Sequence, residues 1–120
     1  MPGMTDLLSQ EQFERMLRPR RPIEDGFLDS YAPFVGIAFG ANWCGPCKRI
    51  DKAAIVKATP SVEWYYCDVD VNSYTHGYCE LSAIPSYVLL KDGTFAAKLE
   101  GPRDAAHVLQ WLKSYGVSVY

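Results

Sequence analysis

The sequence predicts an α/β domain in which helices flank a central mixed β-sheet. Apolar runs with the composition of buried strands alternate with segments of helical periodicity. Later in the chain, an Asp-Gly pair separates two further apolar runs, which predicts an antiparallel hairpin. The alternating part predicts parallel pairing, so the whole sheet is expected to be mixed. The 120 residues are enough for one core, and we expect a single domain over residues 1–120.

The first half predicts a helix, a strand and a second helix. A capping box at Ser9 and Gln12 indicates a helix over about residues 10–18, which a polar, proline-containing loop at about 18–29 ends. The apolar run 34–39 predicts a buried strand, with small residues on one face that would let a helix pack close. The next apolar positions keep the spacing of one helix: Cys47, Ile50, Ala54 and Ala58.

The second half predicts three strands and two helices. The aromatic run 62–69 has the composition of a buried strand, and a helix follows over about 73–81. The hairpin strands are expected at 87–90 and 95–99. An apolar stripe after Pro102 predicts the last helix, which Gly116 can end.

Composition restricts the classes of partner. The chain has 12 Lys and Arg against 14 Asp and Glu, a formal charge of −2, which argues against a nucleic-acid footprint or a basic membrane face. No apolar run approaches the roughly 20 residues of a membrane span, and residues 1–9 lack the form of a signal segment. We therefore expect a cytoplasmic protein whose partners are proteins. Four cysteines are too few for a secreted disulfide scaffold, so a close pair suggests catalysis or metal binding.

Cys44 and Cys47 are placed for thiol–disulfide exchange. They lie two residues apart where the predicted strand ends and a helix begins. The thiolate is the attacking species, and unpaired N–H groups at a helix start would lower the pKa of Cys44. Cys47, one turn inside the helix, would be the more shielded, resolving thiol. Pro46 fits the first helical turn, where its missing N–H costs nothing.

The hexapeptide Trp43 to Lys48, Trp-Cys-Gly-Pro-Cys-Lys, resembles the active site of the thioredoxin family, and Ile84-Pro85-Ser86 is similar to that family's Ile-Pro-Thr loop. The resemblance implies a thioredoxin-like fold and a protein-disulfide reductase with no cofactor. Cys44 would be the nucleophile and Cys47 the resolving cysteine. The implied supporting residues of the active site are Trp43, Gly45, Pro46, Lys48 and Pro85.

The resemblance also implies how targets are held. Pro85 would be a cis-proline, although sequence alone favours a trans bond, and the backbone before it would pair with an extended segment of the target. Trp43, Ala83, Ile84 and Gly101 would line the groove with it. The implied partners are of two kinds. Disulfide-containing proteins would receive electrons from this chain, and an NADPH-dependent thioredoxin reductase would supply them, so the chain would serve in electron transport. We expect a monomer.

Four positions depart from the resembled family. Ala38 stands where a buried aspartate transfers a proton with the resolving cysteine, so we expect slow resolution. Lys52 replaces a helix-kinking proline, Tyr66 replaces a lysine, and Gly40 replaces a common aromatic residue. Asp51 could substitute for the missing acid, although a solvent-facing helix residue is the preferred interpretation. The segment 18–29 is also absent from compact members, and it either tailors partner choice or is a tolerated surface loop.

Two alternatives of other classes remain open at this stage. One is a zinc-binding module with Cys44, Cys47, His76 and Cys79 as ligands. The other is a thioredoxin-shaped interaction or assembly subunit whose redox activity is weak or incidental. For residues outside the motif, plain structural roles are preferred: Cys67 and Cys79 as buried thiols, and His76 and His107 as surface or hydrogen-bonded histidines.

Overall fold

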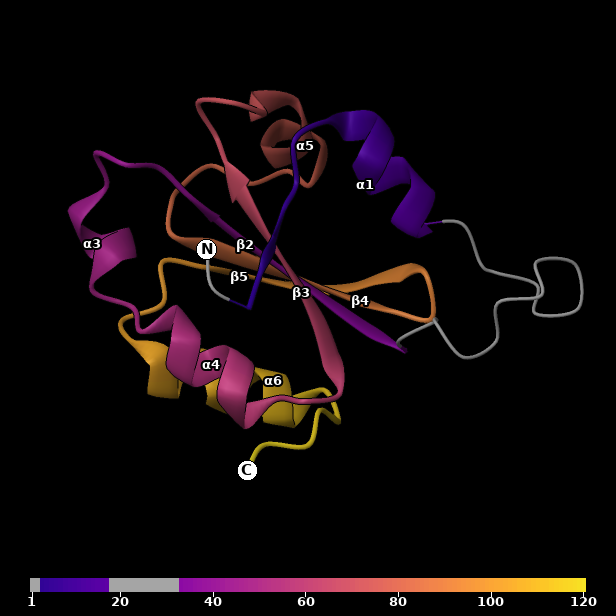
Figure 1. The fold of residues 1–120 in the computed structure, drawn as a ribbon, viewed down its shortest axis with the longest axis vertical. Coiled ribbons are helices and arrows are strands. Elements are labelled where there is room, and N and C mark those ends of the chain that lie inside the picture. Colours follow the sequence, from indigo (N-terminus) through magenta and orange to yellow (C-terminus); the bar gives the residue numbers. More distant parts are fainter. Residues whose placement is uncertain (1–2, 18–32) are drawn as a thin grey trace, which may run out of the picture.

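The fold is a mixed β-sheet with helices on both faces (Figure 1). The computed structural model describes residues 3–17 and 33–120, and the expected loop at 18–29 lies outside them. Within the described residues, five strands lie in the order β1-β3-β2-β4-β5. The strands are β1 (Thr5–Asp6), β2 (Phe34–Gly40), β3 (Val62–Asp68), β4 (Ser86–Lys91) and β5 (Thr94–Glu100). The helices are α1 (Gln10–Leu17), α3 (Gly45–Lys48), α4 (Lys52–Ala58), α5 (Ser73–Tyr78) and α6 (Ala105–Ser114).

Strand β2 lies in the middle of the sheet. It pairs in parallel with β3 and antiparallel with β4, which confirms the predicted mixed sheet. In this register Ala38 of β2 lies between Tyr66 of β3 and Tyr87 of β4. Because β2 and β3 are parallel, their carboxyl ends meet at one edge of the sheet, where Gly40 is opposite Asp68. The cysteine pair follows directly from this edge. Strand β1, short and exposed, was not predicted.

The two faces of the sheet carry separate cores. Figure 1 shows α1 and α5 on one face and α4 and α6 on the other. Ile37 and Phe39 pack on the α1 face, whereas Ala38 belongs to the core under α4 and α6. At Gly36 the structure differs from the prediction that small residues on this second face let a helix approach. A Cβ on Gly36 would lie 2.5 Å from a ring carbon of Trp64, so an indole occupies that space.

The predicted single helix after the cysteine pair is in fact two helices. α3 ends at Lys48, and α4 begins at Lys52. Asp51 has an extended backbone, and its carboxylate accepts a hydrogen bond from the Ala54 amide at 3.0 Å. An aspartate in this N-cap position starts a new helix. The helix is therefore interrupted although Lys52 stands where the resembled family has a helix-kinking proline. Asp51 is the N-cap of α4, so it is neither the mid-helix residue that was expected nor an acid directed at Cys47.

The remaining elements end where backbone conformation dictates. α5 stops at Tyr78, three residues before the predicted end, because Glu80 has a left-handed backbone with φ of 58°. Asp92 and Gly93 also have positive φ, as a tight hairpin turn between β4 and β5 requires. α6 begins after its N-cap Asp104, later than Pro102 predicted, and Gly116 follows its end with φ of 90°. No helix in residues 3–17 or 33–120 is long and apolar enough to cross a membrane.

Candidate active site at the Cys44–Cys47 pair

Cys44 and Cys47 form a disulfide just beyond the end of β2. Their sulfurs are 2.10 Å apart and their Cα atoms 5.3 Å apart. Cys44 is the N-cap of α3, and its Sγ accepts a hydrogen bond from the Cys47 amide at 3.1 Å. α3 has only four residues, so the dipole at the Cys44 sulfur is that of a single helical turn, and the Cys47 amide donates directly to this sulfur. Pro46 occupies the first turn as predicted.

Both cysteines are almost inaccessible. Cys44 is 4% exposed and Cys47 is 2% exposed, so the predicted difference in shielding between them is small. They pack with Ala41, Val69 and Ile84 in an apolar cluster at the edge of the sheet. The surface around the cluster is accessible, because Gly45, Pro46 and Lys48 are all exposed.

Lys52 and Tyr66 approach Cys47 from beneath this cluster. The Lys52 ammonium donates a hydrogen bond to the Cys47 carbonyl at 2.8 Å and lies 6.0 Å from the centre of the Tyr66 ring. Partial burial lowers the pKa of Lys52. Burial raises the pKa of Tyr66, and the nearby Asp68, Cys67 and Asp6 raise it further. A hydroxyl and a cation are therefore built into the site at two of the positions that depart from the resembled family.

The predicted target loop lies against the cysteines. Ile84 packs on the cysteine cluster, and the Ile84–Pro85 peptide bond is cis, as the resemblance implied. Gly101, with φ of 65°, donates its amide to the Pro85 carbonyl at 2.8 Å. The Ala83 carbonyl accepts hydrogen bonds from Ser86 Oγ and, at 3.1 Å, from His76 Nε2. The structure thus brings Ala83, Ile84 and Gly101 together around Pro85.

Glu100 fixes this loop from the neighbouring strand, a contact that the sequence analysis missed. Its carboxylate accepts hydrogen bonds from the Ser82 amide at 2.8 Å and from the Ser82 hydroxyl at 3.2 Å. These hydrogen bonds, chiefly that from the Ser82 amide, lower the pKa of Glu100. The hairpin strand predicted at 95–99 ends just before Glu100, and nothing in the sequence indicates that the Glu100 side chain reaches back to Ser82.

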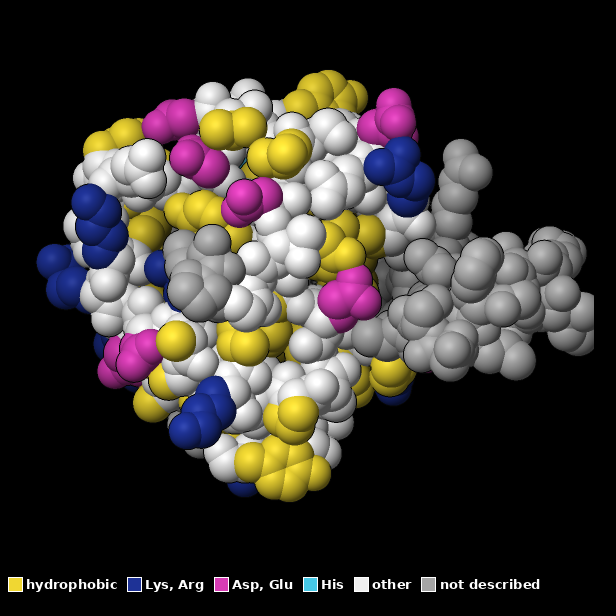
Figure 2. Space-filling model, in the orientation of Figure 1, with side chains coloured by type: hydrophobic (Ala, Val, Ile, Leu, Met, Phe, Trp, Pro, Cys, Tyr) yellow, Lys and Arg dark blue, Asp and Glu magenta, His cyan; other side chains and the backbone are white. Residues whose placement is uncertain are grey.

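Trp43 is held in an exposed position beside the disulfide. Its side chain is 68% exposed, and its indole Nε1 donates to Asp70 Oδ2 at 2.8 Å. Asp70 follows β3, and nothing in the sequence analysis indicated that it holds the indole. Figure 2 shows basic side chains gathered at the left, over α3, and acidic side chains above them, over the segment between β3 and α5. Through the indole hydrogen bond, Trp43 links the loop before α3 to Asp70 in the segment after β3.

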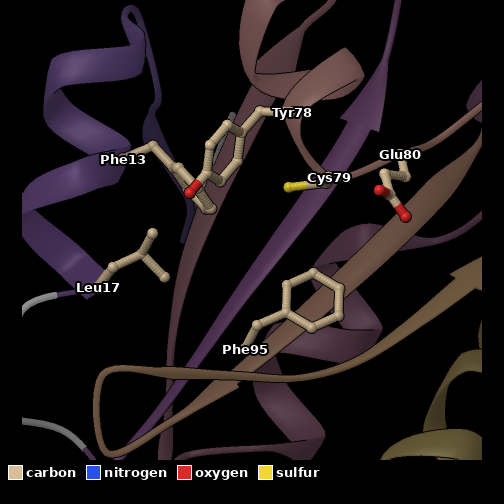
Figure 3. Close-up of a pocket in the computed structure, with 6 residues that line it drawn as sticks. All are labelled: Phe13, Leu17, Tyr78, Cys79, Glu80 and Phe95. Atoms are coloured by element: carbon tan, nitrogen blue, oxygen red, sulfur yellow. The ribbon is translucent and has the colours of Figure 1, made fainter.

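Cys67 and Cys79 lie elsewhere and are buried free thiols, as preferred from the sequence. Burial raises the pKa of Cys67 to about 12 and that of Cys79 to about 11. Cys79 borders a largely apolar cavity of about 300 Å³, and Figure 3 shows its sulfur directed toward the rings of Phe13 and Tyr78. In residues 3–17 and 33–120, no three His, Cys, Asp or Glu side chains gather as a metal site would require. The four ligands of the zinc alternative are thus not brought together.

The two predicted surface or hydrogen-bonded histidines have partners. His76 bonds the Ala83 carbonyl and its ring lies 5.6 Å from that of Phe39. His107 Nδ1 accepts a hydrogen bond from the Arg103 amide at 3.1 Å. These hydrogen bonds and the ring contact of the two histidines are made with groups other than the disulfide.

Comparisons with known proteins agree with this site. Residues 8–114 match the protein family described as Thioredoxin. Mitochondrial thioredoxin-3 of Saccharomyces cerevisiae is 39% identical over 72 residues, which are 58% of this chain and 57% of that protein. The thioredoxin of Chlamydia muridarum is 30% identical over 95 residues, which are 77% of this chain and 93% of that protein. The crystal structure of oxidised mitochondrial thioredoxin 3 from S. cerevisiae matches with a TM-score of 0.73 and 28% identity, over 92% of this chain and 94% of that one. The chain therefore belongs to the thioredoxin family, and its Cys44–Cys47 pair is the centre of a dithiol–disulfide oxidoreductase.

Proposed function

We propose that this chain reduces disulfides in other proteins, with Cys44 as the nucleophile and Cys47 as the resolving cysteine. The observation that carries the proposal is the Cys44–Cys47 disulfide packed against Ile84 of the cis-Pro85 loop. In the reduced chain, the Cys44 thiolate attacks a target disulfide and forms a mixed disulfide. Cys47 then attacks the Cys44 sulfur, which releases the reduced target and restores the intramolecular disulfide.

The target would be held by backbone contacts in the groove formed by Trp43, Ala83, Ile84, Pro85 and Gly101. Two carbonyls of this loop, those of Ala83 and Pro85, already accept hydrogen bonds within the described residues. The Ile84 carbonyl, between them, has no hydrogen-bond donor among the described residues. It would accept a hydrogen bond from an extended segment of the target. Exposed Trp43 would cover the bound segment from the other side. Gly45, Pro46 and Lys48 shape the exposed rim of the pair.

The proposed partners are those of an electron carrier. Disulfide-containing proteins would accept the electrons, and an NADPH-dependent thioredoxin reductase would restore the dithiol. Measurements of location and of molecular mass test the cytoplasmic location and the monomeric state that we also propose. Cell fractionation and analytical ultracentrifugation supply these measurements.

The reductase is tested by a disulfide-reduction assay on a protein substrate with wild type, Cys44→Ser and Cys47→Ser. We expect both variants to lose turnover, and Cys47→Ser to accumulate a covalent adduct through Cys44 that added dithiol releases. An adduct on Cys47 in the Cys44→Ser variant instead would reverse the roles. Turnover that survives either substitution would overturn the proposal, and no observation in the described residues favours the interaction subunit over it.

A further inference from the structure

In the reduced chain, the buried Cys47 thiol has to ionise before it can react. To resolve a mixed disulfide, its sulfur must attack as a thiolate. Cys47 is 2% exposed and lies among Ala41, Val69 and Ile84, and apolar surroundings raise the pKa of a thiol. Water reaches this sulfur poorly, so some group of the protein has to stabilise its negative charge.

The surroundings of Gly40 show that the Tyr66 hydroxyl lies near the Cys47 sulfur. A Cβ placed on Gly40 would lie 2.9 Å from the Tyr66 hydroxyl and 3.4 Å from the Cys47 sulfur. The hydroxyl and the sulfur therefore face the same point above the end of β2, where glycine has no side chain to separate them. Tyr66 reaches this point because its Cα is paired with Ala38, two residues earlier on β2, and a methyl group leaves room for the phenol ring.

The charges around Tyr66 suit a hydrogen-bond donor. The Lys52 ammonium of α4 lies near its ring and bonds the Cys47 carbonyl. Burial, and after it the charges of Asp68, Cys67 and Asp6, raise the pKa of Tyr66 and keep its hydroxyl protonated to a higher pH than an ordinary phenol. Tyr87 of β4 lies on the other side of Ala38 and interacts electrostatically with Tyr66. Tyr66 is thus a neutral donor with a cation beside it.

We propose that the Tyr66 hydroxyl donates a hydrogen bond to the Cys47 thiolate, directly or through one water molecule, and so promotes resolution of the mixed disulfide. The inference rests on the proposed role of Cys47. In this step the Cys47 thiol gives its proton to solvent, and the sulfur's electron pair forms the bond to Cys44 Sγ. The bond between Cys44 and the target sulfur breaks, and the leaving thiolate takes a proton from solvent. The target is reduced by two electrons, the cysteine pair is oxidised by two, and Tyr66 keeps its proton.

The first test measures the Cys47 thiolate without any turnover. In a Cys44→Ser background, the pH dependence of Cys47 alkylation by iodoacetamide is followed by peptide mass spectrometry, which separates Cys47 from Cys67 and Cys79. Tyr66→Phe is expected to raise the midpoint by about one pH unit, because a hydrogen bond to a charged group is worth about tenfold in an equilibrium. An unchanged midpoint in a folded Tyr66→Phe protein would overturn the proposal.

The matched control is Tyr65→Phe. Tyr65 is the preceding residue of β3, its side chain packs with the core on the opposite face, and its hydroxyl bonds Glu63. The same atom is removed from the same strand, yet the Cys47 midpoint is expected to stay where it is. A shift of equal size in both variants would mean a general effect on the strand, and would also overturn the proposal.

The second test has a signature that a loss of structure does not produce. With both cysteines present and excess 5,5′-dithiobis(2-nitrobenzoate), the phase whose rate is independent of reagent concentration reports attack by Cys47. Removing the hydrogen bond lowers the thiolate fraction about tenfold at neutral pH, but a more basic thiolate is about threefold more nucleophilic. Tyr66→Phe should therefore slow resolution about threefold near pH 7 and accelerate it about threefold above both midpoints. A uniform slowing at every pH contradicts the proposal.

If Tyr66→Phe does not fold, 3-fluorotyrosine at position 66 keeps the ring and makes the hydroxyl a stronger donor. The Cys47 midpoint should then fall, and an unchanged or raised midpoint contradicts the proposal. The proposed reductase function fails separately, in the turnover assay. A chain without turnover but with the Tyr66-dependent shift would keep this inference about the thiolate, whereas turnover without the shift would keep only the function.

Discussion

Cys44 and Cys47 are 4% and 2% exposed, and Cys67 and Cys79 are 0% and 4% exposed. By accessibility the two pairs are equivalent, yet their surroundings differ. The Cys44 sulfur accepts a hydrogen bond from the Cys47 amide. The Lys52 ammonium and the Tyr66 hydroxyl lie near Cys47. Cys67 and Cys79 lie in the apolar core on the α1 face, where burial raises both pKa values.

The comparison separates burial from reactivity. Burial by apolar atoms alone stabilises the neutral thiol, and Cys67 shows this even though its sulfur donates to the Asn72 carbonyl at 3.4 Å. That contact binds the thiol proton and does nothing for a thiolate. The N–H group at Cys44 and the hydroxyl beside Cys47 can each donate a hydrogen bond to a negatively charged sulfur. We therefore expect hydrogen-bond donors near a sulfur, and not its exposed area, to distinguish the reactive cysteines of this chain from the buried ones.

The largest expected effect is a contrast in labelling. With pKa values of about 12 and 11 against an ordinary 9.0, Cys67 and Cys79 at neutral pH have about a thousandfold and a hundredfold less thiolate than a free thiol. The reduced, folded chain treated with iodoacetamide at pH 7 should therefore be modified at Cys44 first. Peptide mass spectrometry checks this, and unfolding should make all four cysteines equally reactive. Rapid labelling of Cys67 in the folded chain would break the comparison.

Much of this contrast follows from the sequence. The hexapeptide around Cys44 indicated the exchange chemistry, and the aromatic run that contains Cys67 predicted a buried strand. What the sequence did not predict depends on register and on local competition. Tyr66 and Gly40 are distant in sequence, and only the pairing of β3 with β2 brings the hydroxyl to the sulfur. An aspartate at position 51 is compatible with either a helix surface or an N-cap. Because its carboxylate accepts a hydrogen bond from the Ala54 amide, a new helix starts there and the predicted single helix is divided.

Alanine substitutions of two glycines in β2 are expected to give the next effect. They should differ in the stability that they cost, because Gly36 lies over the core and Gly40 lies at the end of β2 beside the cysteine pair. A Cβ on Gly36 would lie 2.5 Å from the Trp64 ring, which is buried in the core, whereas on Gly40 it would meet the end of the half-buried Tyr66 side chain. Gly36→Ala should cost about 3 kcal/mol and Gly40→Ala about 1 kcal/mol. Urea denaturation measures both. Gly40→Ala should also raise the Cys47 midpoint by displacing the hydroxyl, whereas Gly36→Ala should not. Equal losses of stability would mean that Tyr66 is as firmly packed as Trp64.

Tyr87 provides a smaller effect of opposite sign. It is fully buried, and its hydroxyl has no hydrogen-bond partner among residues 3–17 and 33–120. An unpaired buried hydroxyl costs free energy that a phenyl ring does not. Tyr87→Phe should therefore raise the free energy of unfolding by about 1 kcal/mol in urea denaturation, with the Cys47 midpoint unchanged. The control is again Tyr65→Phe, for which no gain is expected. A loss of stability in Tyr87→Phe would mean that this hydroxyl is paired in solution.

Glu100 gives the smallest effect, a pH dependence confined to the loop at the active edge. Its pKa is lowered below the ordinary 4.5 by hydrogen bonds that are led by the Ser82 amide. Because the folded value is the lower one, the stabilisation is present above pH 4.5 and is lost as the pH falls through the folded pKa. Glu100→Gln should accelerate amide exchange at Ser82 relative to wild type at pH 6, and the difference should disappear at strongly acidic pH. The Tyr120 amide, which donates to the Ala58 carbonyl, is the internal reference for exchange that Glu100 does not control. Equal exchange at Ser82 in both proteins at pH 6 would mean that the exposed carboxylate is not what holds the loop, and that the contact between Gly101 and Pro85 suffices to position it beside the cysteines.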